Sequence, residues 1–181
     1  NKNILITFHP VTLETISSKK IFSNILKALN QYKDIGMIFT YPNFDYDNSI
    51  ISKMIKKYVK ENHNNSMVYQ SLGRFNYLSV MKNVNCVVGN SSSGVIEAPF
   101  LKIPSINIGS RQNGRILSNS VINCSYSSSS IYNSIKKVLM SKKKYNYVTS
   151  KYYKKNAINK SFQIIKNSNF ENLIKKKFYT L

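Results

Sequence analysis

Residues Val87–Ala98 read VVGNSSSGVIEA: an apolar β-branched run, a turn of small residues and an amphipathic segment. This order predicts a buried strand that ends in a tight turn and leads into a helix. Unpaired amides at a helix N-terminus, with serine hydroxyls beside them, suit an anion such as phosphate. The turn at 89–94 is therefore a candidate phosphate site, although an ordinary serine N-cap explains the same residues. It is neither a Walker A loop nor a GxGxxG fingerprint.

The same alternation of strand and helix extends along the chain on both sides of this turn. Short apolar runs predict strands at 3–8, 36–41, 66–69, 85–88, 104–108 and 120–123. Helical patterns and capping serines predict helices at 17–32, 48–61, 77–81, 95–101, 131–140 and 157–166. Strands that are apolar throughout and alternate with helices indicate an α/β fold: a Rossmann-like parallel sheet with helices on both faces. We expect residues 1–166 to form this domain and 167–181 a basic C-terminal tail.

The composition is strongly basic: 27 Lys and Arg face 7 Asp and Glu among 181 residues, for a formal charge of +20. Nucleic-acid readers are usually rich in arginine, and only Arg74, Arg111 and Arg115 occur here. The abundance of Lys, Asn, Ile and Tyr is typical of an AT-rich coding sequence. We therefore predict no nucleic-acid partner, while a polyanion-binding face stays an alternative. The sequence contains no apolar run of the roughly 18 residues that a membrane span needs.

The small number of cysteines favours a protein of the reducing cytoplasm. Cys86 and Cys124 are the two cysteines, and they form neither a disulfide framework nor a metal-binding cluster. We predict no metal, no cofactor and a cytoplasmic location. No paired carboxylates and no serine-nucleophile signature are present, so His9 is the one plausible acid or base.

In a parallel sheet of this kind, ligands bind at the carboxyl ends of the strands. Polar residues that follow predicted strands are therefore candidates: His9, Asn43 with Asp45, Ser71, Asn90, Ser91, Ser92, Ser93 and Arg111. His9 can donate a hydrogen bond to a diphosphate, or be a packed or capping histidine. Arg111 and Arg115 share one loop and suit phosphate, since arginine binds it in bidentate fashion; a surface loop is the alternative. Glu97 either complements the helix dipole or accepts hydrogen bonds from a ribose.

Several of these segments together resemble the C-terminal half of the hydrolysing UDP-N-acetylglucosamine 2-epimerases of the sialic-acid and legionaminate type. The resemblance extends from residue 4 to residue 166. The matching segments occur in the same order along the chain: Thr7–Glu14, Tyr41–Asp45, Ser71–Gly73, Gly89–Glu97 and Ile103–Arg115.

The resemblance implies a two-domain fold of the glycosyltransferase-B type with a UDP-sugar in the interdomain cleft. This chain would supply the UDP-binding domain, and the N-terminal catalytic domain would be absent from it. The implied UDP-binding residues are His9, Asn43, Ser71, Ser91, Ser92, Glu97, Arg111 and Arg115. Among them, His9 would assist catalysis beside the diphosphate, and Glu97 would bind the ribose.

The reaction implied by the resemblance is an elimination followed by hydration. A base removes the proton from C2 of UDP-N-acetylglucosamine or a related UDP-diacetamido sugar, and UDP leaves. Water then adds to the glycal, which gives the free 2-epimer, such as N-acetylmannosamine, for sialic-acid-like sugars. The family's acid and base carboxylates belong to the N-terminal domain, so we expect no turnover by this chain alone, and a homo-oligomer at full length.

Two other functions stay open at this point. One is a nucleotide-sugar glycosyltransferase domain of the same glycosyltransferase-B type. The other is a basic polyanion-binding module without catalysis, which steep salt dependence would reveal.

Overall fold

Six parallel strands form one sheet in the computed structural model, which describes residues 2–11, 14–43, 47–141 and 150–170. The strands are β1 (Lys2–Thr7), β2 (Ile35–Thr40), β3 (Ser66–Tyr69), β4 (Cys86–Gly89), β5 (Ser105–Ile108) and β6 (Val121–Cys124). Their order is β3-β2-β1-β4-β5-β6, so the direction of winding reverses between β1 and β4. This is the Rossmann order, and its reversal opens a crevice at the strands' carboxyl ends. The predicted α/β class is confirmed.

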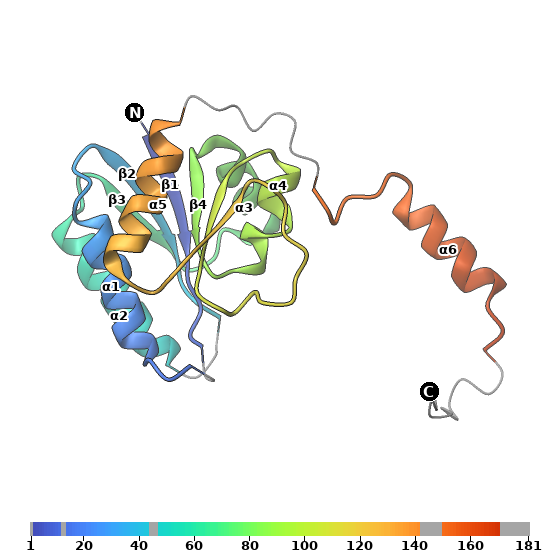
Figure 1. Ribbon diagram of the computed structural model, residues 1–181, viewed down its shortest axis with the longest axis horizontal. Coiled ribbons are helices and arrows are strands. Elements are labelled where there is room, and N and C mark those ends of the chain that lie inside the picture. The colour runs from blue at the N-terminus through green and yellow to red at the C-terminus, as the bar shows by residue number, and fades with distance from the viewer. Residues whose placement is uncertain (1, 12–13, 44–46, 142–149, 171–181) are drawn as a thin grey trace.

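Helices cover both faces of the sheet, as predicted (Figure 1). One face carries α1 (Ser18–Leu29), α2 (Asn48–Glu61) and α5 (Ser128–Met140); the other carries α3 (Gly73–Asn83) and α4 (Glu97–Phe100). The central strand β1 is fully buried from Ile4 and alternates between the two cores. Ile4 and Ile6 belong to the larger core under α1, α2 and α5, whereas Leu5 packs with Met81 and Ala98 under α3 and α4.

The predicted helix at 95–101 is wrong in its extent. The chain instead forms a 3-10 turn, η1 (Ser92–Gly94), and then the single helical turn α4. Pro99 explains the difference, because proline has no amide hydrogen and is tolerated only in the first turn of a helix. A helix that contains Pro99 must therefore begin close to Glu97. In contrast, α3 begins at Gly73, earlier than the predicted 77–81.

The last described helix, α6 (Ala157–Asn167), lies away from the sheet (Figure 1). Ile158, Phe162 and Ile165 share one face of it and are 84%, 60% and 59% exposed. The chain reaches α6 through residues that touch α4, where the rings of Phe100 and Tyr153 lie 5.1 Å apart. Residues 142–149 and 171–181 lie outside the described part of the chain, and so does most of the predicted tail.

Gly89 allows β4 to approach β1 at the point where the two strands separate. It has a φ of +143°, and a Cβ placed there would overlap the carbonyl oxygen of Thr7, its neighbour in the sheet register. Only glycine fits this position, both for its conformation and for its contact. The close approach places the residues after β1 beside those after β4.

We predict that Gly89→Ala destabilises the chain by at least about 2 kcal/mol more than Gly114→Ala does. Gly114 also has a positive φ, of +81°, but a Cβ there would meet nothing within 4 Å. The comparison therefore separates the backbone collision from the conformational strain. Urea unfolding of both variants measures the difference, and equal losses would contradict the prediction.

Candidate functional site

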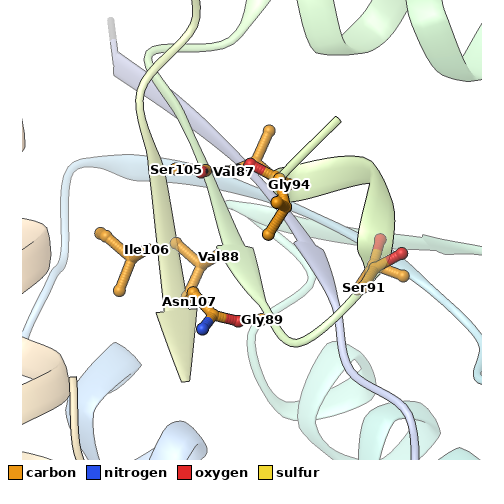
Figure 2. A pocket seen from close by; sticks show the side chains of 10 residues that line it. Val87, Val88, Gly89, Ser91, Gly94, Ser105, Ile106 and Asn107 are labelled. Atoms are coloured by element: carbon orange, nitrogen blue, oxygen red, sulfur yellow. Dashed lines mark hydrogen bonds between the residues drawn. The ribbon is translucent and has the colours of Figure 1, made fainter. Parts of the chain in front are cut away.

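A cavity of about 520 Å³ opens at the carboxyl ends of β1 to β4, beside the reversal of the sheet. Its volume lies in the usual range for small-ligand sites, roughly 300–1,000 Å³. Five of the predicted candidates line it: His9, Asn43, Ser71, Ser91 and Ser93. The structure thus brings together residues from four separate loops. A second cavity, between β4 and β5 under the turn, is only about 10 Å³ and cannot hold a nucleotide (Figure 2).

Asn90 joins the loops on either side of the crevice. Its side chain is fully buried; Oδ1 accepts from the His9 amide at 2.7 Å, and Nδ2 donates to the His9 carbonyl at 2.8 Å. The backbone amide and carbonyl of His9 thereby hold the loop after β1 against the loop after β4. Each of these groups is buried, so each needs the partner that Asn90 provides.

The Arg111 loop is fixed to the same residue. The backbone carbonyl of Asn90 accepts from Arg111 Nη1 at 3.1 Å and from Gln112 Nε2 at 2.7 Å. Arg111 is otherwise exposed and has further donors available; it lines neither cavity, and its bond to Asn90 places it beside the loop after β4. Arg115 is exposed and lines neither cavity, so the structure does not bring it to the site.

His9 is 6% exposed, and one hydrogen bond sets its tautomer. Its Nδ1 accepts from the backbone amide of Asn43 at 3.2 Å. A neutral imidazole that accepts at Nδ1 carries its proton on Nε2. His9 is therefore oriented as a hydrogen-bond donor through Nε2.

The serine turn packs tightly against β5. Gly94 is buried over Ser105, whose hydroxyl donates to the Gly94 carbonyl (Figure 2). Ser91 caps η1, and its Oγ accepts from the Ser93 amide. Ser92 lies in the turn but lines neither cavity. The helix that follows the turn is shorter than predicted, because η1 and α4 are each a single turn. The phosphate site at the turn stays a prediction.

Glu97 carries the one charged atom among the buried side-chain atoms that lack a hydrogen-bond partner in the described structure. That atom is Oε2. A buried carboxylate oxygen without a donor is costly in a folded protein. Glu97 lines neither cavity, and a ligand hydroxyl that reached Oε2 would supply the missing hydrogen bond.

Comparison with known proteins assigns the family. Residues 1–166 match the family described as UDP-N-acetylglucosamine 2-epimerase. The chain belongs to this family. A Campylobacter jejuni protein named GDP/UDP-N,N'-diacetylbacillosamine 2-epimerase (hydrolyzing) is 40% identical over 118 residues, which are 65% of this chain and 31% of that protein. The Escherichia coli polysialic acid biosynthesis protein P7 is 34% identical over 166 residues, 90% of this chain and 42% of that protein.

Solved structures of this family share the fold. The Staphylococcus aureus protein MnaA, in a co-structure with UDP, superposes with a TM-score of 0.70 at 18% identity. The match covers 99% of this chain and 48% of MnaA. The chain therefore spans less than half the length of each of these three proteins.

Glu14 holds the Arg111 loop from its other side. The hydroxyls of Ser110 and Tyr126 both donate to its Oε1, the latter at 2.7 Å. Tyr126 also fills the space beside Gly109, where a Cβ would overlap its ring. The hydrogen bonds from Ser110 and Tyr126 hold the pKa of the Glu14 carboxyl below its ordinary value. The loop is thus anchored at two points, Asn90 and Glu14.

Several residues of the site were missed by the sequence reasoning. Thr7, Thr40, Arg74 and Tyr77 line the cavity, and Gln112 bonds to the carbonyl of Asn90. Thr7 and Thr40 are the last residues of their strands. The expectation that ligands bind at the carboxyl ends of strands, which selected His9, therefore applies to them as well. In contrast, Arg74 and Tyr77 belong to α3, and their helical pattern carries no sign of a ligand.

The described residues contain neither a candidate metal-binding cluster nor a candidate membrane-spanning helix. No group of three or more His, Cys, Asp or Glu side chains there is placed to hold a metal ion. None of the described helices is long and apolar enough to cross a bilayer.

We predict that Asn90→Ala destabilises the chain by about 2–4 kcal/mol, because two buried peptide groups of His9 lose their partners. Asn83→Ala is the matched control: Asn83 is exposed and bonds only locally, to Ser79. Urea unfolding gives both values. A loss for Asn90→Ala no greater than that of the control would contradict the role of Asn90.

We predict that the stability advantage of the wild type over Glu14→Gln shrinks in acid. The pKa of Glu14 is lowered in the folded state, so its stabilisation is complete above the ordinary value of 4.5 and is lost as the pH falls through the folded-state pKa. Thermal unfolding of both proteins between about pH 7 and about pH 3 tests this. A constant difference across that range would contradict it.

Proposed function

We propose that this chain is the UDP-sugar-binding half of a hydrolysing UDP-N-acetylglucosamine 2-epimerase. The observation that carries the proposal is the cavity at the β1/β4 reversal, where His9 and Ser91 face one space of nucleotide size. Membership of the family supports the same reading.

The diphosphate would lie between the serine turn and the Arg111 loop. The Ser91 hydroxyl supplies a neutral donor at the cavity wall, and the Arg111 guanidinium supplies charge from the neighbouring loop. Ser92, which lines neither cavity, stays a prediction from the sequence. The Nε2 proton of His9 is oriented to donate to a diphosphate oxygen. Charge-assisted hydrogen bonds of this kind are roughly twice as strong as neutral ones.

The nucleoside would extend from the diphosphate toward α4 and the loops after β2 and β3. Oε2 of Glu97 accepts from a ribose hydroxyl, which satisfies its buried oxygen. Asn43 and Ser71 line the remaining wall of the pocket. Arg115 has no support from this geometry as a nucleotide ligand.

In the reaction, the bond between C1 of the sugar and the UDP oxygen breaks as a base removes the C2 proton. UDP departs with the electron pair of that bond, and negative charge grows on its oxygens. His9 and Arg111 would stabilise this charge. Water then adds to the glycal, and the base would come from the N-terminal half implied by the family resemblance.

The substrate would be UDP-N-acetylglucosamine or a related UDP-diacetamido sugar, with the free 2-epimer used for sialic-acid-like sugars. The name of the Campylobacter jejuni relative supports the diacetamido variant. Free thiols at Cys86 and Cys124 support a cytoplasmic location. A homo-oligomer of the full-length protein stays a prediction.

We predict that the chain binds UDP and that Glu97→Ala and Arg111→Ala each weaken binding at least tenfold, since each loses a hydrogen bond to a charged group. Isothermal titration calorimetry measures the dissociation constants. Glu61→Ala and Lys137→Ala, on outer helix faces, are the matched charge controls and should bind as the wild type does.

Two results would contradict the proposal. One is a folded wild type that does not bind UDP. The other is a polyanion such as heparin that binds in its place, with affinity falling steeply as salt rises. UDP binding through a few fixed donors should depend only modestly on salt.

A further inference from the structure

Five hydroxyl groups form a continuous row along the wall of the cavity. Thr40 Oγ1 and Thr7 Oγ1 are 2.8 Å apart, and Thr7 Oγ1 and the Tyr77 hydroxyl 3.2 Å. The Tyr77 hydroxyl lies 2.8 Å from Ser93 Oγ, which lies 3.0 Å from Ser91 Oγ. The row crosses from β2 to β1, to α3 and to the serine turn. All five residues line the cavity of about 520 Å³.

The direction of the row follows from counting protons, because each hydroxyl has one to donate. Ser93 donates to Ser91 Oγ, so its proton is used and it must accept from Tyr77. The proton of Tyr77 is then used, and the hydroxyl of Thr7 must donate to it.

The same count fixes the two ends of the row. The proton of Thr7 is committed to Tyr77, so Thr40 donates to Thr7. At the other end, Ser91 Oγ accepts from both the hydroxyl and the amide of Ser93. Every hydroxyl proton in the row is thus assigned except that of Ser91.

We propose that Tyr77 is a positioning residue that commits the Ser91 hydroxyl to donate to a phosphate oxygen of the bound nucleotide. The inference rests on the proposed function, since it assumes that the cavity takes a nucleoside diphosphate. Ser91 Oγ already accepts hydrogen bonds from the amide and the hydroxyl of Ser93. Its own proton is therefore available to donate to an anion in the cavity. Donors aligned in one direction polarise one another, which strengthens the last one.

The phenol of Tyr77 suits this role. Burial raises its pKa, so it stays protonated and able to donate at neutral pH. Without its hydroxyl, Ser93 Oγ lacks a side-chain donor, and the Ser91 proton can turn back to Ser93. A phenylalanine would keep the ring packing and remove only this link.

The experiment compares the wild type with Tyr77→Phe by calorimetry, using UDP, pyrophosphate and uridine as separate probes. We expect Tyr77→Phe to weaken UDP and pyrophosphate binding about fivefold and to leave uridine binding unchanged. Tyr58→Phe is the matched control, because its buried hydroxyl bonds to Met37 Sδ, remote from the cavity. Thermal unfolding of both variants checks that they fold.

A double-mutant cycle with Ser91→Ala separates positioning from packing. If Tyr77 acts through Ser91, Tyr77→Phe has no further effect on UDP binding in the Ser91→Ala protein. The same fivefold loss in both backgrounds would show a packing role and overturn the inference. Unchanged UDP binding by Tyr77→Phe would also overturn it, while the proposed function would stand.

If the wild type fails to bind UDP, the proposed function is wrong, and pyrophosphate decides the inference. A fivefold loss of pyrophosphate binding in Tyr77→Phe would still support the directed row. No pyrophosphate binding, or binding that the variant leaves unchanged, would overturn the row as well.

Discussion

The hydrogen bonds of Asn90 are the constraint on which the rest of the site depends. At the reversal of a Rossmann sheet the neighbouring connections depart in opposite directions, and the crevice between them has no regular backbone pairing. Asn90 supplies that pairing with one amide, bonded to both peptide groups of His9. Its own carbonyl then holds Arg111 and Gln112. Three loops that bear site residues are thereby set relative to one another before any ligand binds.

The charge of the site differs from the charge of the chain. The formal charge is +20, yet the cavity wall is built largely from hydroxyls, amides and one imidazole. The three arginines differ in position: Arg74 lines the cavity, Arg111 bonds to the carbonyl of Asn90 without lining the cavity, and Arg115 does neither. Neutral donors held in fixed positions favour a bound anion through hydrogen bonds. A cluster of positive charges would instead create a strong field that attracts any polyanion. The lysines on the outer helices therefore say little about the ligand.

Local pattern predicted much of the fold, because these strands are buried on both faces and carry unbroken apolar runs. The helix 48–61 and the strand 66–69 were predicted with the bounds that the structure shows. The helix at 95–101 failed because Pro99 overrides the pattern around it. Tyr77 and the linking role of Asn90 were not predicted for another reason. Each acts through partners distant in sequence, such as Thr7 and His9, and periodicity cannot show such partners.

The orientation of His9 divides binding from chemistry. Its Nδ1 accepts from the backbone of Asn43, so the neutral ring presents a proton at Nε2. A group that presents a proton can stabilise a departing diphosphate, but it cannot take a proton from a sugar carbon. Glu97, the one carboxylate with a buried unpaired oxygen in the described residues, follows the serine turn along the chain, and the proposed function gives it the ribose. Under the proposed function, this chain would stabilise the leaving group, and another group would remove the C2 proton.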